Sequence, residues 1–189
     1  MKSFKIIWKS SVILFLLFAA ALFLSVPATV RAEDIQLTFD KGIKYSTDWS
    51  PNGKWITYER HASGVPRDIF IVPAKGGTPI NLTTGIDGQC WFPKFNYNSQ
   101  EVNFTQILSG MYTIMSVDIS QLDKKNPKPI EPRIIRENAL HGRWSHGGRY
   151  LAYTDATTTP WKLCVWDRVQ DKSWPIGDGS NAPIPSWSH

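Results

Sequence analysis

The stretch WSPNGKWITY, Trp49–Tyr58, decides how this sequence is organised, because it returns further along the chain. It reads FNYNSQEVNF at Phe95–Phe104 and WSHGGRYLAY at Trp144–Tyr153, and a fourth start, WSH, stands at Trp187–His189. The first residues of these copies are 46, 49 and 43 positions apart. A recurrence with a period of roughly 20 to 50 residues is typical of solenoids, propellers and other repeat architectures.

Each copy has the pattern of a β-hairpin. An aromatic residue comes first, and the four positions after it are rich in Ser, Asn and Gly, which suit tight turns. Apolar and polar residues then alternate with a period of two, which indicates a strand with one buried face. The aligned apolar positions are Ile56, Val102 and Leu151, followed by Tyr58, Phe104 and Tyr153.

Further strands are predicted after each hairpin, which brings every unit to about four. Four short strands in roughly 45 residues correspond to one blade of a β-propeller. We therefore expect an all-β propeller of four-stranded blades, and no segment after residue 32 has a competing helical pattern. The predicted blades lie at about 43–85, 86–137 and 138–179, and the start of a fourth lies at 180–189.

One strand is predicted outside these blades. The stretch Ile35–Thr38 is similar to Ile80–Thr83, the last strand of the first blade, but no three strands precede it. In a closed propeller such a strand completes the final blade. We therefore expect Ile35–Phe39 to close a ring in this way.

The first 32 residues have the features of a secretory signal peptide. Three lysines precede an apolar run at 12–26, and small residues at 30 and 32 suit cleavage after Ala32. The run is short for a spanning helix, which needs about 20 residues; an uncleaved anchor stays open as an alternative. We expect a periplasmic or secreted protein with no stable membrane insertion after cleavage.

Cleavage also changes the charge balance. The whole chain carries 21 Lys and Arg against 16 Asp and Glu, a formal net charge of +5. Four of the basic residues and none of the acidic ones lie in the first 32, so the remainder has a formal charge of +1. A nearly neutral chain gives no support to a nucleic-acid or acidic-membrane partner.

Two cysteines, Cys90 and Cys164, occupy unrelated positions in their repeats. In an exported protein they could form a disulfide between neighbouring repeats. The pattern is also typical of two separate small apolar residues in sheets, and we favour that interpretation because two cysteines at unrelated positions do not define a framework.

The repeat resembles that of the TolB-type β-propeller family, a relative of the WD repeat. The resemblance rests on IQLTFD at 35–40, DWSPNGKWITY at 48–58, DIFIV at 68–72 and INLT at 80–83. It covers nearly all of 34–189 and is weakest in the second copy, where Phe95 and Ser99 replace Trp and Gly. The match is to the repeat and not to TolB itself, which carries an additional domain before its propeller.

The resemblance implies a closed ring of six or seven blades. Members of the TolB-type family include a periplasmic protein of the Tol-Pal envelope system, propeller domains of prolyl oligopeptidase-like enzymes and other exported proteins. Six blades require roughly 270 residues, so we interpret this chain as the front of a longer, monomeric protein or a truncated reading frame. A short form that closes by oligomerisation is the alternative.

The sequence contains no recognised catalytic or metal-binding motif. The sequence has no G-x-S-x-G, no H-E-x-x-H, no phosphate-binding glycine loop and no zinc-site spacing. His146 and His189 share one turn position in successive blades, and we interpret them as turn residues rather than ligands. We therefore expect no catalytic residue, no metal site and no cofactor in this chain.

Three residues are candidates for ligand binding. We expect Tyr45, Trp91 and His141 to stand just before the innermost strands of their blades, where propeller loops face the central channel. Aromatic side chains there could bind a peptide or a sugar. The alternative is that they pack between blades.

Three function classes follow. The first is an exported, noncatalytic propeller of the bacterial envelope that binds a protein, peptide or glycan partner. The second is the N-terminal propeller domain of a prolyl oligopeptidase-like hydrolase whose catalytic domain lies beyond His189. The third, a propeller enzyme with a site in its channel, requires an acid–base pair or metal cluster that this sequence does not show. As given, we expect the chain to be noncatalytic.

Overall fold

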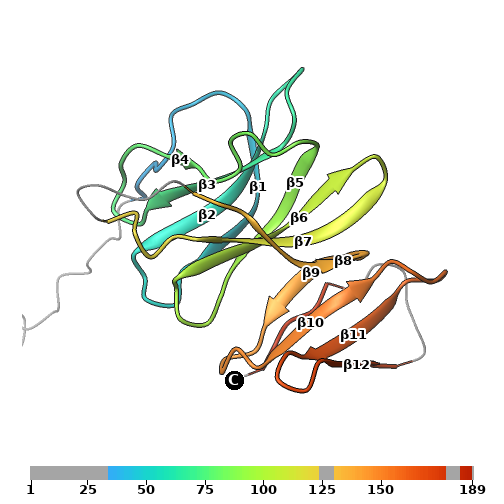
Figure 1. Cartoon of the computed structure of the whole chain (residues 1–189). Coiled ribbons are helices and arrows are strands. Elements are labelled where there is room, and N and C mark those ends of the chain that lie inside the picture. The colour runs from blue at the N-terminus through green and yellow to red at the C-terminus, as the bar shows by residue number, and fades with distance from the viewer. Residues whose placement is uncertain (1–33, 124–129, 178–183, 189) are drawn as a thin grey trace, which may run out of the picture. The chain divides into compact units, whose positions relative to one another are not determined.

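The computed structural model describes residues 34–123, 130–177 and 184–188. Within these ranges it contains twelve strands and no helix (Figure 1). Contacts divide the chain into two units, Met1–Ile35 and Gln36–His189, and all twelve strands belong to the second. The predicted signal peptide at 1–32 lies outside the described residues, as do residues 180–183 and 189 of the predicted start of a fourth blade.

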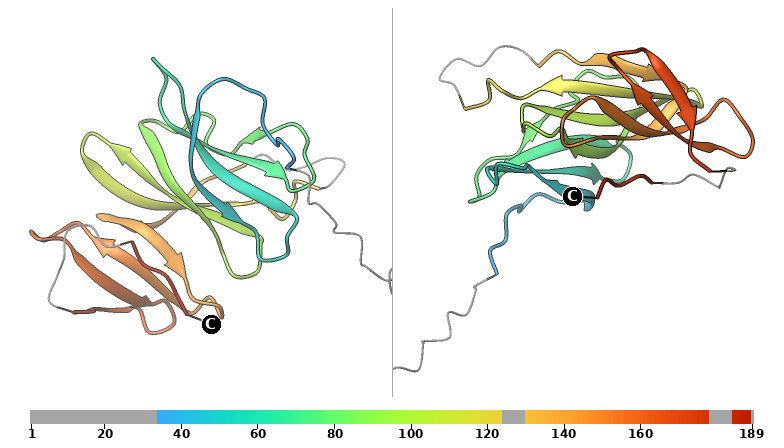
Figure 2. Two further views of the ribbon diagram at one scale, coloured as in Figure 1. Left: turned by 180° about the vertical axis from the view of Figure 1, so that it is seen from behind. Right: turned by 90° about the horizontal axis from the view of Figure 1, so that it is seen from below.

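The strands form three antiparallel sheets of four strands each, and in each sheet the spatial order follows the sequence. Figure 2 shows the sheets from two further sides. The first sheet contains β1 (Ile43–Trp49), β2 (Trp55–His61), β3 (Asp68–Pro73) and β4 (Ile80–Asn81). The second contains β5 (Gln89–Phe95), β6 (Glu101–Leu108), β7 (Met111–Asp118) and β8 (Arg133–Glu137). The third contains β9 (Ala139–Trp144), β10 (Tyr150–Asp155), β11 (Lys162–Asp167) and β12 (Lys172–Pro175).

This arrangement confirms the predicted all-β fold of four-stranded blades. The described strands form three blades and no closed ring. We call β1, β5 and β9 the inner strands, because each is the first strand of its blade and β5 contacts both β1 and β9.

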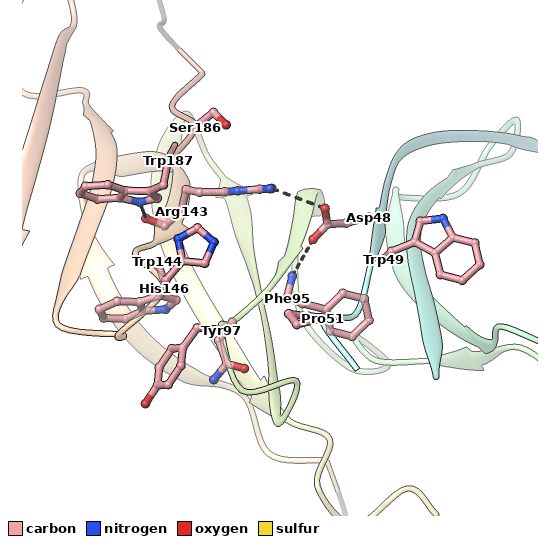
Figure 3. A pocket seen from close by; sticks show the side chains of 11 residues that line it. Asp48, Trp49, Pro51, Phe95, Tyr97, Arg143, Trp144, His146, Ser186 and Trp187 are labelled. Atoms are coloured by element: carbon pink, nitrogen blue, oxygen red, sulfur yellow. Dashed lines mark hydrogen bonds and ion pairs between the residues drawn. The ribbon is translucent and has the colours of Figure 1, made fainter. Parts of the chain in front are cut away.

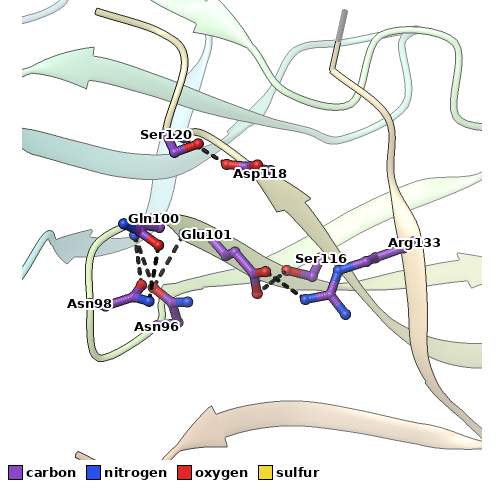
Figure 4. A network of polar contacts seen from close by, with 8 residues as sticks. All are labelled: Asn96, Asn98, Gln100, Glu101, Ser116, Asp118, Ser120 and Arg133. Atoms are coloured by element: carbon purple, nitrogen blue, oxygen red, sulfur yellow. Dashed lines mark hydrogen bonds and ion pairs between the residues drawn. The ribbon is translucent and has the colours of Figure 1, made fainter. Parts of the chain in front are cut away.

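The four residues after the first aromatic residue of each repeat copy lie in the turn between the first two strands of its blade. Ser50 and Ser145 accept hydrogen bonds on Oγ from the backbone N–H of Trp55 and Tyr150, at 2.9 and 3.2 Å. In the second blade the Oδ1 of Asn96 takes this role toward Glu101, at 3.2 Å (Figure 4). A side-chain acceptor at this position therefore caps the strand that follows the turn.

Glu101 also connects the strands of the second blade. Its carboxylate accepts hydrogen bonds from Arg133 on β8, at 2.6 Å, and from the hydroxyl of Ser116 on β7, at 3.2 Å (Figure 4).

All three inner strands contain a β-bulge at the same repeat position. The ladder shifts register after Tyr45, after Trp91, and opposite Ala152–Thr154 on β10. The residue in the bulge has a positive φ in every case, and these residues are Ser46 (50°), Phe92 (56°) and His141 (60°). A bulge turns a strand's side chains and backbone groups in new directions.

The bulges bond to the preceding blade. The backbone N–H of Phe92 donates to Oε2 of Glu59 on β2, at 3.1 Å. The backbone N–H of His141 donates to Oγ1 of Thr105 on β6, at 3.2 Å. Glu59 and Thr105 stand at equivalent positions of their blades. The same repeat position therefore supplies the hydrogen-bond acceptor that connects each of these blades to the next.

Two apolar clusters fill the spaces between neighbouring blades. The first joins residues of the first and second blades around Ile69, Ile71 and Phe104. The second joins Ile114 of the second blade to residues of the third, including Leu151 and Tyr153. Cys90 belongs to the first cluster and Cys164 to the second, and both are buried free thiols. No disulfide therefore joins them.

The strand predicted at Ile35–Phe39 is absent from this structure. Residues 34–39 have no strand hydrogen bonding, because a strand forms only beside a partner edge, and no described strand pairs with them. Leu37 instead packs on the outer face of the first blade, against a cluster of Ile56, Tyr58, Phe70 and Val72.

Candidate functional site

The inner strands and the segment 184–188 bring equivalent repeat positions to the same place. We define the anchor aromatics as Trp49, Phe95, Trp144 and Trp187, which begin the four copies of the repeat. The residues three positions before the anchors are Ser46, Phe92, His141 and Ile184. All four line one cavity of about 140 Å³, together with Lys94, Arg143 and Pro185.

A larger cavity of about 470 Å³ lies beside the anchor aromatics (Figure 3). All four anchors line it, so its walls are rich in aromatic side chains. Asp48 and Arg143 bring charge to it. The remaining lining residues are Pro51, Asn96, Tyr97, His146 and Ser186. Its volume falls in the range of about 300–1,000 Å³ that is usual for ligand pockets.

Three charged residues from three blades meet beside this cavity: Asp48 and Arg143 line it, and Lys94 lines the smaller cavity. Asp48, Lys94 and Arg143 each stand one position before an anchor aromatic. The Oδ1 of Asp48 lies 3.6 Å from Nζ of Lys94 and 3.4 Å from a terminal guanidinium nitrogen of Arg143. Figure 3 shows Asp48 and Arg143 pointing toward one another across the pocket. We call these three residues the charge cluster.

The second oxygen of Asp48 is occupied by the protein backbone. Its Oδ2 accepts a hydrogen bond of 2.9 Å from the backbone N–H of Phe95. The carboxylate therefore connects the first blade to the second by a hydrogen bond and to the third by an ion pair.

Burial also affects the charge cluster. Desolvation lowers the pKa of Lys94 from its usual value, and the charge of Arg143 lowers it further, whereas Asp48 opposes both effects. A cation held in a partly dry environment interacts more strongly with an added anion than it would in water.

A second group of aromatic side chains surrounds Arg67, which lies in the connection between β2 and β3. Its guanidinium lies 4.5 Å from the ring centre of Trp91 and 5.4 Å from that of Tyr45. It also forms an ion pair of 3.1 Å with Glu59. Tyr45 and Trp91, two of the predicted binding residues, therefore contact the same cation.

His141, the third predicted binding residue, lines the smaller cavity but is only 8% exposed. Its ring packs edge-on against Phe92 with 4.3 Å between ring centres, and its Nδ1 lies 3.2 Å from Oγ1 of Thr154. Much of its surface is thus in contact with the protein.

The three predicted residues do not stand before the inner strands, as expected, but inside them. Tyr45 lies within β1, Trp91 within β5 and His141 within β9. They are also not equivalent, because His141 matches Ser46 and Phe92, one position after Tyr45 and Trp91. Tyr45 and Trp91 share one repeat position and contact Arg67, whereas His141 shares the next position with Ser46 and Phe92 and lines the smaller cavity.

Sequence reasoning missed the charge cluster. Asp48, Lys94 and Arg143 differ in charge and carry no motif, so none is notable alone. Their shared position directly before the anchor aromatics is the signal that could have found them. No group of three or more His, Cys, Asp or Glu side chains suited to a metal ion occurs among the described residues.

Solved structures similar to this chain are β-propellers. A TolB from Acinetobacter baumannii matches 80% of this chain and 37% of its own length, at 18% identity and a TM-score of 0.62. A protein from Agrobacterium tumefaciens assigned as a TolB matches 74% and 50%, at 16% identity and a TM-score of 0.56. The β-propeller domain of the Trilobed protease from Pyrococcus furiosus matches 72% and 43%, at 12% identity and a TM-score of 0.51.

These similarities show the fold of this chain, which is that of a TolB-type β-propeller. The chain spans half the length of these structures or less. No protein-family model and no curated protein matches the sequence.

Proposed function

We propose that this chain is the propeller part, 33–189, of an exported, noncatalytic protein that binds a protein, peptide or glycan partner in the bacterial envelope. The observation that carries the proposal is the larger cavity, where equivalent positions of four repeats meet. Aromatic walls around a few charged groups are typical of sites that bind other molecules.

A peptide is the partner class that the cavity supports best. Its aromatic walls offer apolar contact area, and the charge cluster offers polar contacts at one side. A peptide segment supplies both kinds of group, and the volume of about 470 Å³ accommodates a few side chains.

Export rests on the signal-peptide pattern of residues 1–32. We propose that this segment is removed after Ala32, which would release the propeller into the periplasm or the medium. Among the described residues, no helix has the length and apolar character needed to cross a bilayer.

Peptide display on the immobilised chain tests the binding proposal. Trp49 lines the cavity and is 59% exposed, so its replacement by Ala removes contact area without emptying a core. We expect Trp49→Ala to weaken the binding of selected peptides by about tenfold or more, with the affinity measured by fluorescence anisotropy. Trp174→Ala is the matched control, because Trp174 is 43% exposed and lies on β12 away from the cavity lining. Equal effects of the two variants, or a failure to select any peptide, would contradict the proposal.

A second candidate is the N-terminal propeller domain of a prolyl oligopeptidase-like hydrolase. It is supported by the similarity to the propeller domain of the Trilobed protease. Reading the gene beyond the codon for His189 tests it. A downstream G-x-S-x-G motif at a strand-to-helix turn would support this candidate, whereas further blades alone would support the binding protein.

A further inference from the structure

The charge cluster holds more positive charge than its own carboxylate neutralises. Lys94 and Arg143 both face the Oδ1 of Asp48, and Oδ2 is already engaged by the backbone of Phe95. In the part of the chain that the structure describes, Asp48 supplies the only carboxylate in ion-pair contact with either cation. Two cations against one anion leave a net charge of +1 beside the cavity.

The contacts within the cluster are also long. Charge-assisted hydrogen bonds between nitrogen and a carboxylate usually measure about 2.7–2.9 Å. Arg149 meets Asp167 at 2.7 and 3.0 Å, and Arg133 meets Glu101 at 2.6 Å, so this chain forms close pairs elsewhere. The 3.4 and 3.6 Å separations at Asp48 show that one carboxylate oxygen does not satisfy both cations at close range.

The two cations remain accessible to a ligand. The side chain of Lys94 is 22% exposed and that of Arg143 is 33% exposed. Arg143 lines both cavities, Lys94 lines the smaller one and Asp48 lines the larger one. The cluster therefore lies where the two cavities adjoin, and a group entering from either side meets a cation.

We infer that Lys94 and Arg143 form a carboxylate-binding subsite, which takes an acidic side chain or the C-terminal carboxylate of a peptide. The inference rests on the proposed function and names the ligand chemistry. Asp48 acts as an internal competitor that holds the cations in position when the subsite is empty. The anchor aromatics Trp49 and Trp144 contact the apolar part of the same peptide.

Arg143 suits this role because its guanidinium presents five N–H donors in a planar fork, which matches a carboxylate in two parallel hydrogen bonds. Lys94 adds a point charge from the neighbouring blade. A ligand carboxylate and Asp48 would then share two cations, which gives each anion its own closest partner.

Four libraries of labelled pentapeptides test the inference on the purified chain. Their N-terminus is acetylated, and they are random in uncharged residues except for Glu or Gln at the third position and a free or amidated C-terminus. We expect the libraries with Glu or a free C-terminus to bind at least about tenfold more tightly than the neutral library, measured by fluorescence anisotropy. The preference should weaken as salt is raised, because screening reduces the attraction between partly exposed charges.

Three variants separate ligand binding from a structural role of the cluster. Arg143→Gln and Lys94→Gln should each reduce the preference for acidic peptides by about tenfold. Asp48→Asn should increase it by several-fold, because Asn removes the competing charge and keeps an oxygen that can accept from the N–H of Phe95. Lys172→Gln is the control for net charge, since Lys172 is exposed on β12, outside both cavity linings, and it should change nothing.

The outcomes are distinguishable. Equal binding of acidic and neutral libraries overturns the carboxylate subsite but leaves the proposed function intact. Failure of all four libraries to bind overturns peptide binding as a whole. If Asp48→Asn loses the preference for acidic peptides, Asp48 does not act as a competitor. If inorganic phosphate displaces acidic peptides as strongly as acetate does, the cations form a general anion site and not a carboxylate subsite.

Discussion

At the residue scale, Gly148 shows how one position can join two blades. It has a φ of +64°, which side chains with a Cβ rarely adopt, and a Cβ added there would fall within the ring of Tyr97 from the second blade. The neighbouring Gly147 has open space around its Cβ position. The two glycines of one turn therefore have different roles: Gly148 allows a contact between blades and Gly147 does not.

We expect Gly148→Ala to lower the free energy of unfolding by about 1–2 kcal/mol, because the left-handed backbone is strained by a Cβ even if Tyr97 moves aside. Gly147→Ala should change it by less than about 0.5 kcal/mol. Urea unfolding followed by tryptophan fluorescence measures both values. Equal effects would show that the contact with Tyr97 and the backbone angle are unimportant.

Asp167 gives a residue-scale prediction for pH. Its carboxylate accepts two hydrogen bonds from Arg149, at 2.7 and 3.0 Å, and this pair holds the pKa of Asp167 below its usual value. A depressed pKa contributes stability above the unfolded-state pKa of about 3.9, and this contribution disappears as the pH falls through the lower folded-state pKa. We expect the free energy of unfolding of Asp167→Asn to fall less steeply below about pH 4 than that of the unchanged chain, measured by acid unfolding. The same pH dependence in both proteins would contradict this.

At the scale of elements, the inner-strand bulges determine both the connection between blades and the position of the site. A bulge leaves one backbone N–H outside its own ladder, and here Glu59 and Thr105 accept two such groups from the next blade. The same bulges direct Phe92 and His141 into the smaller cavity. The inner-strand bulges therefore both join neighbouring blades and shape the smaller cavity.

We expect Thr105→Val to destabilise the chain by about 1–3 kcal/mol, because it removes the acceptor of the buried N–H of His141 while keeping the side-chain shape. Thr113→Val on β7 is the matched control, since Thr113 is half-buried in the same sheet and makes no such bond to the bulge. Chemical denaturation measures both, and hydrogen exchange at His141 should be faster only in Thr105→Val. Protection unchanged at His141 would rule out this connection.

At the scale of the whole molecule, the anchor aromatics face the preceding blade. Phe95 is 6% exposed in the cluster between the first two blades, and Trp144 packs in the cluster between the second and third. Trp49 stands at the same repeat position, but no described blade precedes the first, and it is 59% exposed. Equivalent residues thus have different energetic roles, and the role depends on position along the array.

We expect Phe95→Ala to cost about 3–5 kcal/mol through the loss of a buried aromatic ring. Trp49→Ala, at the equivalent position, should cost less than about 1 kcal/mol. Denaturant midpoints of the two variants measure the difference. A large cost for Trp49→Ala would mean that another element covers the outer face of the first blade.

The fold could be predicted because its information is local. About ten consecutive residues contain both the turn residues after each anchor and the alternation that follows them. Because this pattern recurs along the chain, each copy strengthens the prediction of a blade. The candidate site was predicted only in part. Tyr45, Trp91 and His141 were expected just before the inner strands and lie within them. His141 is out of register with the other two, because it stands three positions before its anchor aromatic and they stand four positions before theirs.

The sequence by itself determined the blade repeat, the four strands of each blade and the capped turns, since each depends on neighbours in the chain. Only the tertiary structure decided that Asp48, Lys94 and Arg143 meet, that Arg67 lies against Tyr45 and Trp91, and that Trp49 is exposed. These facts depend on how one sheet packs on the next. Residues nearly fifty positions apart become neighbours through that packing, and no local pattern records which atoms will then touch.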